Sequence, residues 1–238
     1  RNKDGAFLEF HPADKAWQLT PERGFRTFVD IIGSAGRTVW EPFQCGPAAG
    51  VRQRMYLTPH EVGVEEIDPR LELGIRADTF TLAEAAVAGV VRRVEIVNSA
   101  AQARTLRIVD GLPQVLPYGL NQWAVKFMSR TSEAFMRVEG VDERLAFYRL
   151  AVWPTDSPQV ERVIAGNFFA GFLDGKRTAV LVDPERVFGR AGDLARPLCF
   201  GAGARLDLAD QVVANQTPAA FQVLDLQLEL AARLVKGH

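Results

Sequence analysis

Alternation of apolar and polar residues is the clearest pattern in this chain. In FQVLDLQLEL, residues 221–230, every second residue from Leu224 is a leucine, and the residues between them are polar. A period of two predicts a strand with one face in the core and the other in water. The same alternation recurs in residues 93–98 and 105–111, and Asn98-Ser99 supplies turn residues between them. We predict that these two runs pair as a hairpin.

Turn residues divide much of the remaining chain into short extended segments. The run at 145–153 is apolar on both faces except at Arg149, which is typical of a strand covered on both sides. The run at 166–183 is interrupted by Asp174-Gly175, a dipeptide typical of hairpin turns. Further strands are predicted at 5–10, 24–32 and 71–82.

One stretch, DGLPQVLPYGLNQW at 110–123, interrupts the strand pattern. Pro113 and Pro117 fix φ and remove backbone donors, so the stretch is an ordered crossing and not a helix or a central strand. A helix is predicted after it, with Asn121 as its N-cap and an apolar face. That face comprises Trp123, Phe127, Met128, Thr131 and Phe135. The fold class that follows is mainly β, an antiparallel sandwich with one helical crossing.

Aromatic residues are the main candidates for ligand contact, because Trp and Tyr offer sugars a flat apolar face with a polar handle. Tyr148 and Trp153 are predicted to lie in the core, since their strand is apolar. Core packing is also favoured for Trp123 on the predicted helix face. For Tyr118, between Pro117 and Gly119, core and surface both stay open. The candidate carbohydrate contacts are Tyr118, Asn121, Trp123 and His60.

The charge and hydropathy of the chain exclude some classes of binding partner. The 238 residues include 28 Lys and Arg against 29 Asp and Glu, so no basic surface for nucleic acid is expected. No apolar run reaches the ~20 residues of a membrane span. One domain over 1–238 fits the length. The start at Arg1 fits either processing or a segment of a longer protein, and we favour the segment. Without a secretory signal we expect a cytoplasmic protein. For Cys45 and Cys199, a long-range disulfide and two free thiols both fit.

Catalytic motifs are not recognisable. His60 stands near three glutamates, but a zinc-protease motif needs a second His where this chain has Val64. On a strand, His60 would share a face with Glu66. No GxSxG nucleophile or phosphate-binding glycine loop is present. We therefore predict no catalytic residues, no metal and no cofactor in this chain.

Residues 56–119 carry a resemblance to a known family. The segments GIRADTFTL (74–82), RRVEIVN (92–98) and TLRIVDG (105–111) resemble the N-terminal domain of the cellobiose phosphorylase family, inverting glycoside phosphorylases once grouped as glycosyltransferase family 36. The similarity continues through FYRLAVW and GNFFAGF and returns at 217–238. Where the family usually continues into a polar strand, this chain has VDGLPQVLPYG, which marks a divergent branch.

The resemblance implies a β-supersandwich of the galactose-mutarotase-like type. It implies a non-catalytic domain that supports a helical-barrel catalytic domain of the same chain and can also contact oligosaccharide. In the family the general acid and the inorganic phosphate site belong to that barrel. An apolar patch at Leu116, Tyr118 or Leu120 is then expected, with the Pro-rich loop used for packing. A freestanding carbohydrate-binding module and a mutarotase-like epimerase that uses His60 are the alternative functions. A second copy of the chain, in a homodimer, is a further candidate partner.

Overall fold

The structure is a computed structural model that describes residues 6–8, 13–33, 36–121, 123–154, 158–190, 194–200, 206–229 and 233–235. It is mainly β, with 43% of the described residues in strands and 11% in helices, and its sheets are antiparallel. The predicted fold class, an antiparallel β-sandwich, is therefore confirmed. No described helix is long and apolar enough to cross a membrane.

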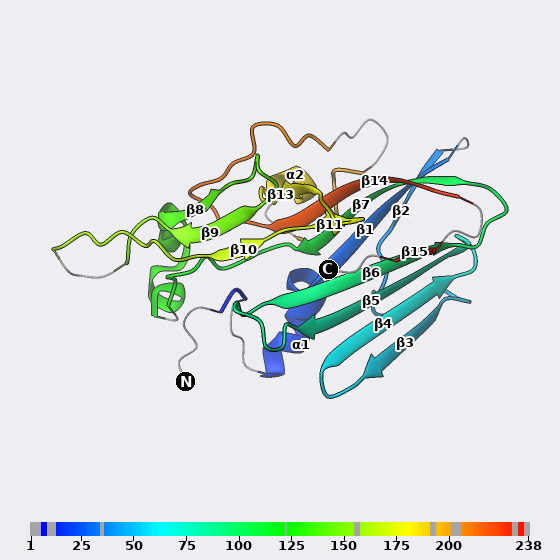
Figure 1. The fold of residues 1–238 in the computed structure, drawn as a ribbon, viewed down its shortest axis with the longest axis horizontal. Coiled ribbons are helices and arrows are strands. Elements are labelled where there is room, and N and C mark those ends of the chain that lie inside the picture. The colour runs from blue at the N-terminus through cyan, green and yellow to red at the C-terminus, as the bar shows by residue number, and fades with distance from the viewer. Residues whose placement is uncertain are drawn as a thin grey trace. The chain divides into compact units, whose positions relative to one another are not determined.

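The described strands form four sheets, which can be followed in Figure 1. One five-stranded sheet has the order β13 (Ala179–Leu181), β14 (Ala220–Leu228), β7 (Arg104–Leu112), β1 (Arg26–Gly33), β2 (Gly36–Trp40). The other has the order β15 (Arg233–Val235), β6 (Val90–Asn98), β5 (Leu73–Thr81), β4 (Glu61–Asp68), β3 (Arg52–Leu57). The small sheets are β10 (Asn167–Phe169), β9 (Ala146–Leu150), β8 (Met136–Glu139), and the hairpin β11 (Phe172–Leu173), β12 (Lys176–Arg177).

Helical segments are short. They are α1 (Ala13–Arg23), the π-helix η1 (Ala124–Met128), the 3-10 helix η2 (Ser129–Phe135) and α2 (Glu185–Phe188). The backbone divides into two compact units. Unit 1 comprises 1–27, 109–171 and 177–223, and unit 2 comprises 28–108, 172–176 and 224–238. The single domain over 1–238 stays a prediction.

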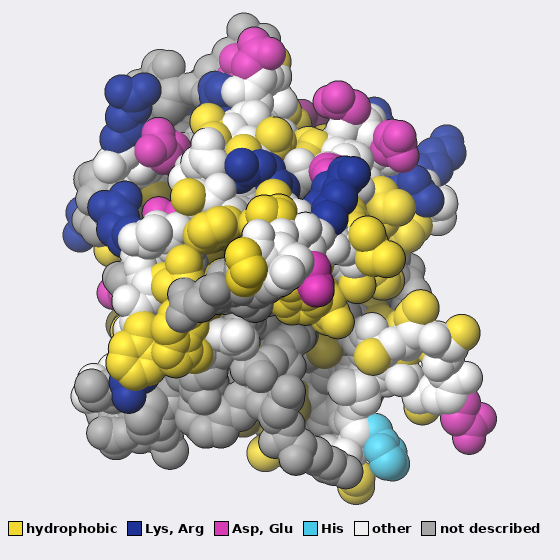
Figure 2. All heavy atoms as spheres, turned by 90° about the vertical axis from the view of Figure 1, so that its left-hand side faces the viewer, with side chains coloured by type: hydrophobic (Ala, Val, Ile, Leu, Met, Phe, Trp, Pro, Cys, Tyr) yellow, Lys and Arg dark blue, Asp and Glu magenta, His cyan; other side chains and the backbone are white. Residues whose placement is uncertain are grey.

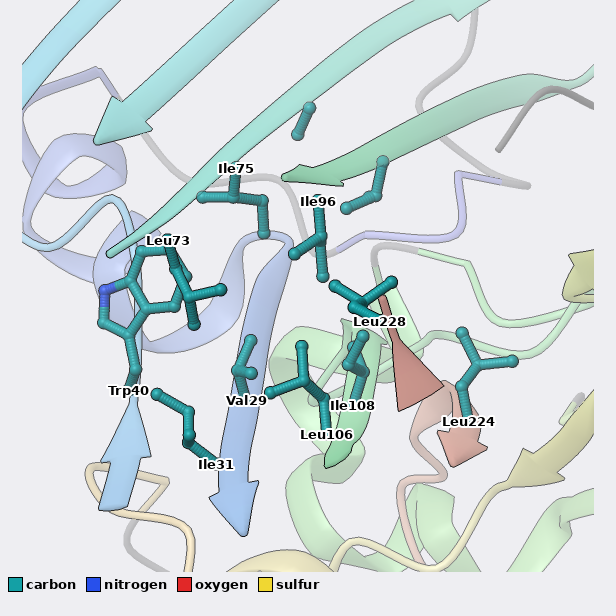
Figure 3. Packing of buried hydrophobic residues seen from close by; sticks show 12 residues of the cluster. Val29, Ile31, Trp40, Leu73, Ile75, Ile96, Leu106, Ile108, Leu224 and Leu228 are labelled. Atoms are coloured by element: carbon teal, nitrogen blue, oxygen red, sulfur yellow. The ribbon is translucent and has the colours of Figure 1, made fainter. Parts of the chain in front are cut away.

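Unit 2 is a two-layer β-sandwich. Alternate residues of β5 and β6, such as Ile75 and Ile96, point inward and are fully buried. Figure 3 shows them facing Val29, Leu106 and Leu228 from the opposite layer. Trp40 closes one side of this core, and its indole Nε1 donates to Glu66 Oε1 at 3.0 Å. The period-two pattern of the sequence thus produces the apolar interior of this unit.

The outer face of β3–β6 is polar and its charges alternate. In register across the sheet lie Arg54, Glu65, Arg76 and Glu95. Opposite charges that face each other on neighbouring strands stabilise a sheet and fix its register. The neighbouring row contains the buried Asp78, which accepts hydrogen bonds from Arg76 and Arg93.

Unit 1 is built around β8, β9 and β10. Tyr148 of β9 is buried, as the sequence predicts, and its hydroxyl donates to the Ala219 carbonyl at 2.9 Å. Burial raises the pKa of this phenol. Around it pack Leu112, Val115, Val138, Ala146, Val180, Val182 and Ala220. A second cluster comprises Leu120, Ala124, Met136, Leu150 and Val163.

Several strand predictions are confirmed, and one hairpin is wrong. The predicted strands at 24–32, 71–82, 145–153 and 221–230 correspond to β1, β5, β9 and β14. The predicted turn at Asp174-Gly175 connects strand β11 to strand β12. The runs at 93–98 and 105–111 do form strands, β6 and β7, but these belong to different sheets. Asn98 makes the expected turn, since its Oδ1 accepts a hydrogen bond from the backbone amide of Ala100. Its side-chain Nδ2 donates a hydrogen bond to the Leu228 carbonyl. The chain therefore crosses from one layer to the other at this turn.

Two further predictions concern the termini and the cysteines. Of the predicted strand at 5–10, residues 6–8 are described and form no strand; the rest lie outside the described residues. Both cysteines are free thiols, since Cys45 is exposed and Cys199 is buried without a disulfide.

Candidate functional site

The Pro-rich loop before η1 is fixed to its surroundings by backbone hydrogen bonds. The amide of Val115 donates to the Pro218 carbonyl at 2.8 Å, and the amide of Leu116 donates to the Phe7 carbonyl at 2.8 Å. Farther along, the amide of Leu150 donates to the Tyr118 carbonyl at 3.0 Å. The loop is therefore the ordered crossing that the sequence predicts.

This loop forms one wall of a cleft of about 470 Å³ in unit 1. The cleft brings together the end of α1, the Pro-rich loop, η1, η2 and the residue before Pro218. Its apolar lining is Leu8, Leu19, Gly24, Leu116, Leu120, Val125 and Met136, and its polar lining is Thr20, Arg23, Gln114, Arg130, Ser132, Glu133 and Thr217. The volume of this cleft and its mixture of apolar and polar lining residues fall within the range of small-molecule sites.

Hydrogen bonds position the carboxylate of the cleft. Thr217 Oγ1 donates to Glu133 Oε1 at 2.9 Å. The other carboxylate oxygen lies 3.7 Å from Arg130 Nε, and the Arg130 side chain is 93% exposed. Ser132, by contrast, is buried in the wall. A fixed carboxylate acceptor, hydroxyl groups and an amide offer hydrogen bonds to a ligand that carries several hydroxyls.

The helix that follows the loop differs from the prediction in form and in orientation. Asn121 is the expected cap, since its Oδ1 accepts from the amide of Ala124 at 2.8 Å. However, the next turn is a π-helix, which has more residues per turn than an α-helix, so the predicted apolar face does not stay on one side. Ala124 is buried instead, while Trp123 and Phe127 are 51% and 64% exposed. The prediction that Trp123 packs in the core is therefore wrong.

Aromatic rings gather near the loop in two pairs. Tyr118 is half-buried and meets Trp153 edge to face, with ring centroids 6.2 Å apart. Trp153 is itself 37% exposed, so its predicted place in the core is also wrong: β9 ends at Leu150, before this residue. Trp123 and Phe127 form the second pair at 5.8 Å.

Several large apolar side chains of unit 1 are exposed, and together they are called its exposed apolar surface. They include Trp123, Phe127, Trp153, Val160, Ile164 and Phe168. Figure 2 shows hydrophobic side chains gathered on the face that carries the left-hand elements of Figure 1, among them β8 to β10. The patch expected at Leu116, Tyr118 or Leu120 has other members, because Leu120 is buried and the first two are half-buried.

His60 belongs to the other unit. It lies exposed in the turn between β3 and β4, where its amide donates to Thr58 Oγ1 at 3.3 Å. Because β4 begins at Glu61, His60 is not part of the strand on which it would share a face with Glu66. The four candidate residues are thus divided: Tyr118, Asn121 and Trp123 in unit 1, and His60 in unit 2.

Metal-binding side chains do not cluster in the described ranges, where no group of three or more His, Cys, Asp or Glu is placed to hold an ion. The chain matches no family model and no curated protein. The cleft therefore has to be interpreted from its own residues. Sequence reasoning did not find Arg23, the Arg130–Glu133 pair or Thr217, because these three parts of the cleft are far apart in the chain and no local motif joins them.

Proposed function

We propose that this chain is a non-catalytic β-sandwich domain of a glycoside phosphorylase or hydrolase, and that it contacts carbohydrate in the cleft of unit 1. One observation carries the proposal: the loop that departs from the resembled family lines a cleft that has both leucine and polar side chains in its lining. Sugars present an apolar ring face and a periphery of hydroxyls. The lining residues Leu116 and Leu120 suit the first, and the lining residues Gln114, Glu133 and Thr217 suit the second.

The supporting role is proposed for the exposed apolar surface of unit 1. Trp123 and Phe127 expose more than half of their side chains, and such surfaces usually mark contact with another protein surface. A helical-barrel catalytic domain of the same chain is the partner that the resemblance implies. On this proposal the apolar surface packs against that domain, and the cleft stays open to a sugar.

Calorimetric titration of the 238-residue chain with cellobiose and cellotetraose tests the carbohydrate contact. Arg130→Ala removes a rim side chain that is 93% exposed, so folding should be unaffected while sugar affinity falls about tenfold. The matched control is Arg190→Ala. The Arg190 side chain is also 93% exposed, and its Nε lies 3.5 Å from Glu185 Oε2. Arg190 does not line the cleft. Unchanged affinity in Arg130→Ala, or equal losses in both variants, would contradict the proposal.

A freestanding carbohydrate-binding module is the second candidate, because Tyr118 and Trp153 form a partly exposed aromatic pair. In that case the sugar would stack on these rings and not enter the cleft. Trp153→Ala would then abolish binding in the same titration, and Arg130→Ala would not affect it. The cleft proposal predicts the reverse order of effects.

A further inference from the structure

Strand β3 lies at the end of the strand order in its sheet, in the part of unit 2 that the structure describes. It pairs with β4 on one side, and all six of its residues are exposed. The open edge of a strand presents unpaired N–H and C=O groups to any strand that can pair with it. The edge of β3 is therefore a potential interaction surface.

The core face of the sheet continues onto this edge. In register with the buried Ala77 and Val94 lie Val64 on β4 and then Met55 on β3. Met55 is 65% exposed, and Leu57 on the same face is 70% exposed. The apolar face of the sandwich thus extends past the layer that covers it, and additional apolar surface at β3 would bury it.

The backbone pattern shows which residues of β3 are free to pair. The amide of Thr58 donates to the Glu61 carbonyl across the turn at 3.0 Å. Antiparallel partners alternate along a strand, so the even-numbered residues of β3 direct their backbone groups toward β4. The backbone groups of Gln53, Met55 and Leu57 therefore point away from the sheet.

We infer that β3 pairs antiparallel with β3 of a second copy, about a two-fold axis at Met55. In this register Met55 faces Met55 of the second copy, and Gln53 faces Leu57 of the second copy. All three outward-pointing residues then find partners. A shift of the axis to a neighbouring residue leaves one of them unpaired.

Charge favours the same register. Centred on Met55, the pairing sets Arg54 beside Tyr56 of the second copy, a contact between a guanidinium and an aromatic ring. An axis at Arg54 would place two Arg54 side chains opposite each other, and an axis at Gln53 would oppose Arg52 to Arg54. Like charges that face each other across strands are destabilising. Charges often protect an edge from pairing. In the Met55-centred register no two arginines face each other directly, and the two Arg54 side chains are diagonal neighbours.

The interface is small, so we expect a dimer with a Kd in about the micromolar range. Light scattering coupled to gel filtration, run over a series of concentrations, should give a mass that rises from 26.3 kDa toward twice that value. Met55→Arg places two guanidinium groups on the axis and should raise the Kd at least about tenfold. The control, Val160→Arg, changes a side chain that is 82% exposed in unit 1 and should not affect the mass.

Cross-linking tests the register independently. In a Cys45→Ser background, Met55→Cys should form a reducible dimer on mild oxidation, because paired Cα atoms on antiparallel strands lie about 5.5 Å apart, within disulfide range. Val160→Cys in the same background is the control. A chain that stays monomeric at every concentration would overturn the inference, and so would a dimer that persists in Met55→Arg. A Met55→Cys dimer no more abundant than the control's would overturn the register.

Discussion

Replacing Tyr118 by Ala tests whether the Pro-rich loop is held by packing. The Tyr118 ring packs against the cluster of Leu120, Leu150 and Met136 and meets Trp153 at 6.2 Å. Truncation of a fully buried aromatic costs about 3–5 kcal/mol, and this ring is half-buried, which suggests ~2 kcal/mol. Loss of the aromatic pair adds about 0.5–1.5 kcal/mol. We expect the free energy of unfolding to fall by about 2.5–3.5 kcal/mol.

Urea denaturation followed by tryptophan fluorescence measures this loss. If the two units unfold in separate transitions, the loss belongs to the transition of unit 1. Tyr118→Phe keeps the ring and should stay within about 0.5 kcal/mol of the wild type. Trp123→Ala, which removes a ring that is 51% exposed, should cost less than Tyr118→Ala. A loss in Tyr118→Ala no larger than in Trp123→Ala would refute the packing argument.

Three more substitutions test the fold. Gly111 has φ +152°, and a Cβ there would lie 1.9 Å from the Ala220 carbonyl oxygen. Gly111→Ala should therefore lower the free energy of unfolding, measured by urea denaturation, by more than ~3 kcal/mol. The control is Gly175→Ala, which has open space around it and should lower it by about 1 kcal/mol. Tyr148→Phe should cost about 1 kcal/mol by the same assay, because the Ala219 carbonyl loses a buried donor. Hydrogen bonds from Arg70 lower the pKa of Asp68, so this carboxylate stabilises the fold above its unfolded pKa near ~4. The stability difference between wild type and Asp68→Asn should therefore shrink as the pH falls through the folded pKa, and a difference that is constant from pH 7 to 2 would contradict this.

Local sequence patterns predict the strands of this protein well, because each pattern reflects which face of a strand is buried. The alternation in 221–230 and the turn at Asp174-Gly175 both reappear in the structure. The same patterns do not predict which strands pair with each other. Residues 93–98 and 105–111 have the alternation of a hairpin, and only the packing of two layers decides that they separate. Period two gives the buried face of a strand, and it does not identify the neighbouring strand.

The site illustrates a second limit of the sequence. The rigid loop and the Asn121 cap follow from local chemistry, and both are confirmed. The orientation of Trp123 does not, because a π-helical turn replaces the α-helix whose periodicity the prediction assumes. The cleft itself depends on residues such as Arg23, Glu133 and Thr217, which only the folded chain brings together.

Residue-level mapping of sugar binding tests the central proposal most directly. We suggest titrating the ¹⁵N-labelled chain with cellotetraose and following the amide resonances. The account predicts that the shifts concentrate at the cleft, at Gln114, Leu120, Ser132 and Glu133, while His60 in unit 2 does not respond. No shifts at sugar concentrations up to about 10 mM, or shifts confined to Trp153 and Tyr118 with none in the cleft, would contradict it.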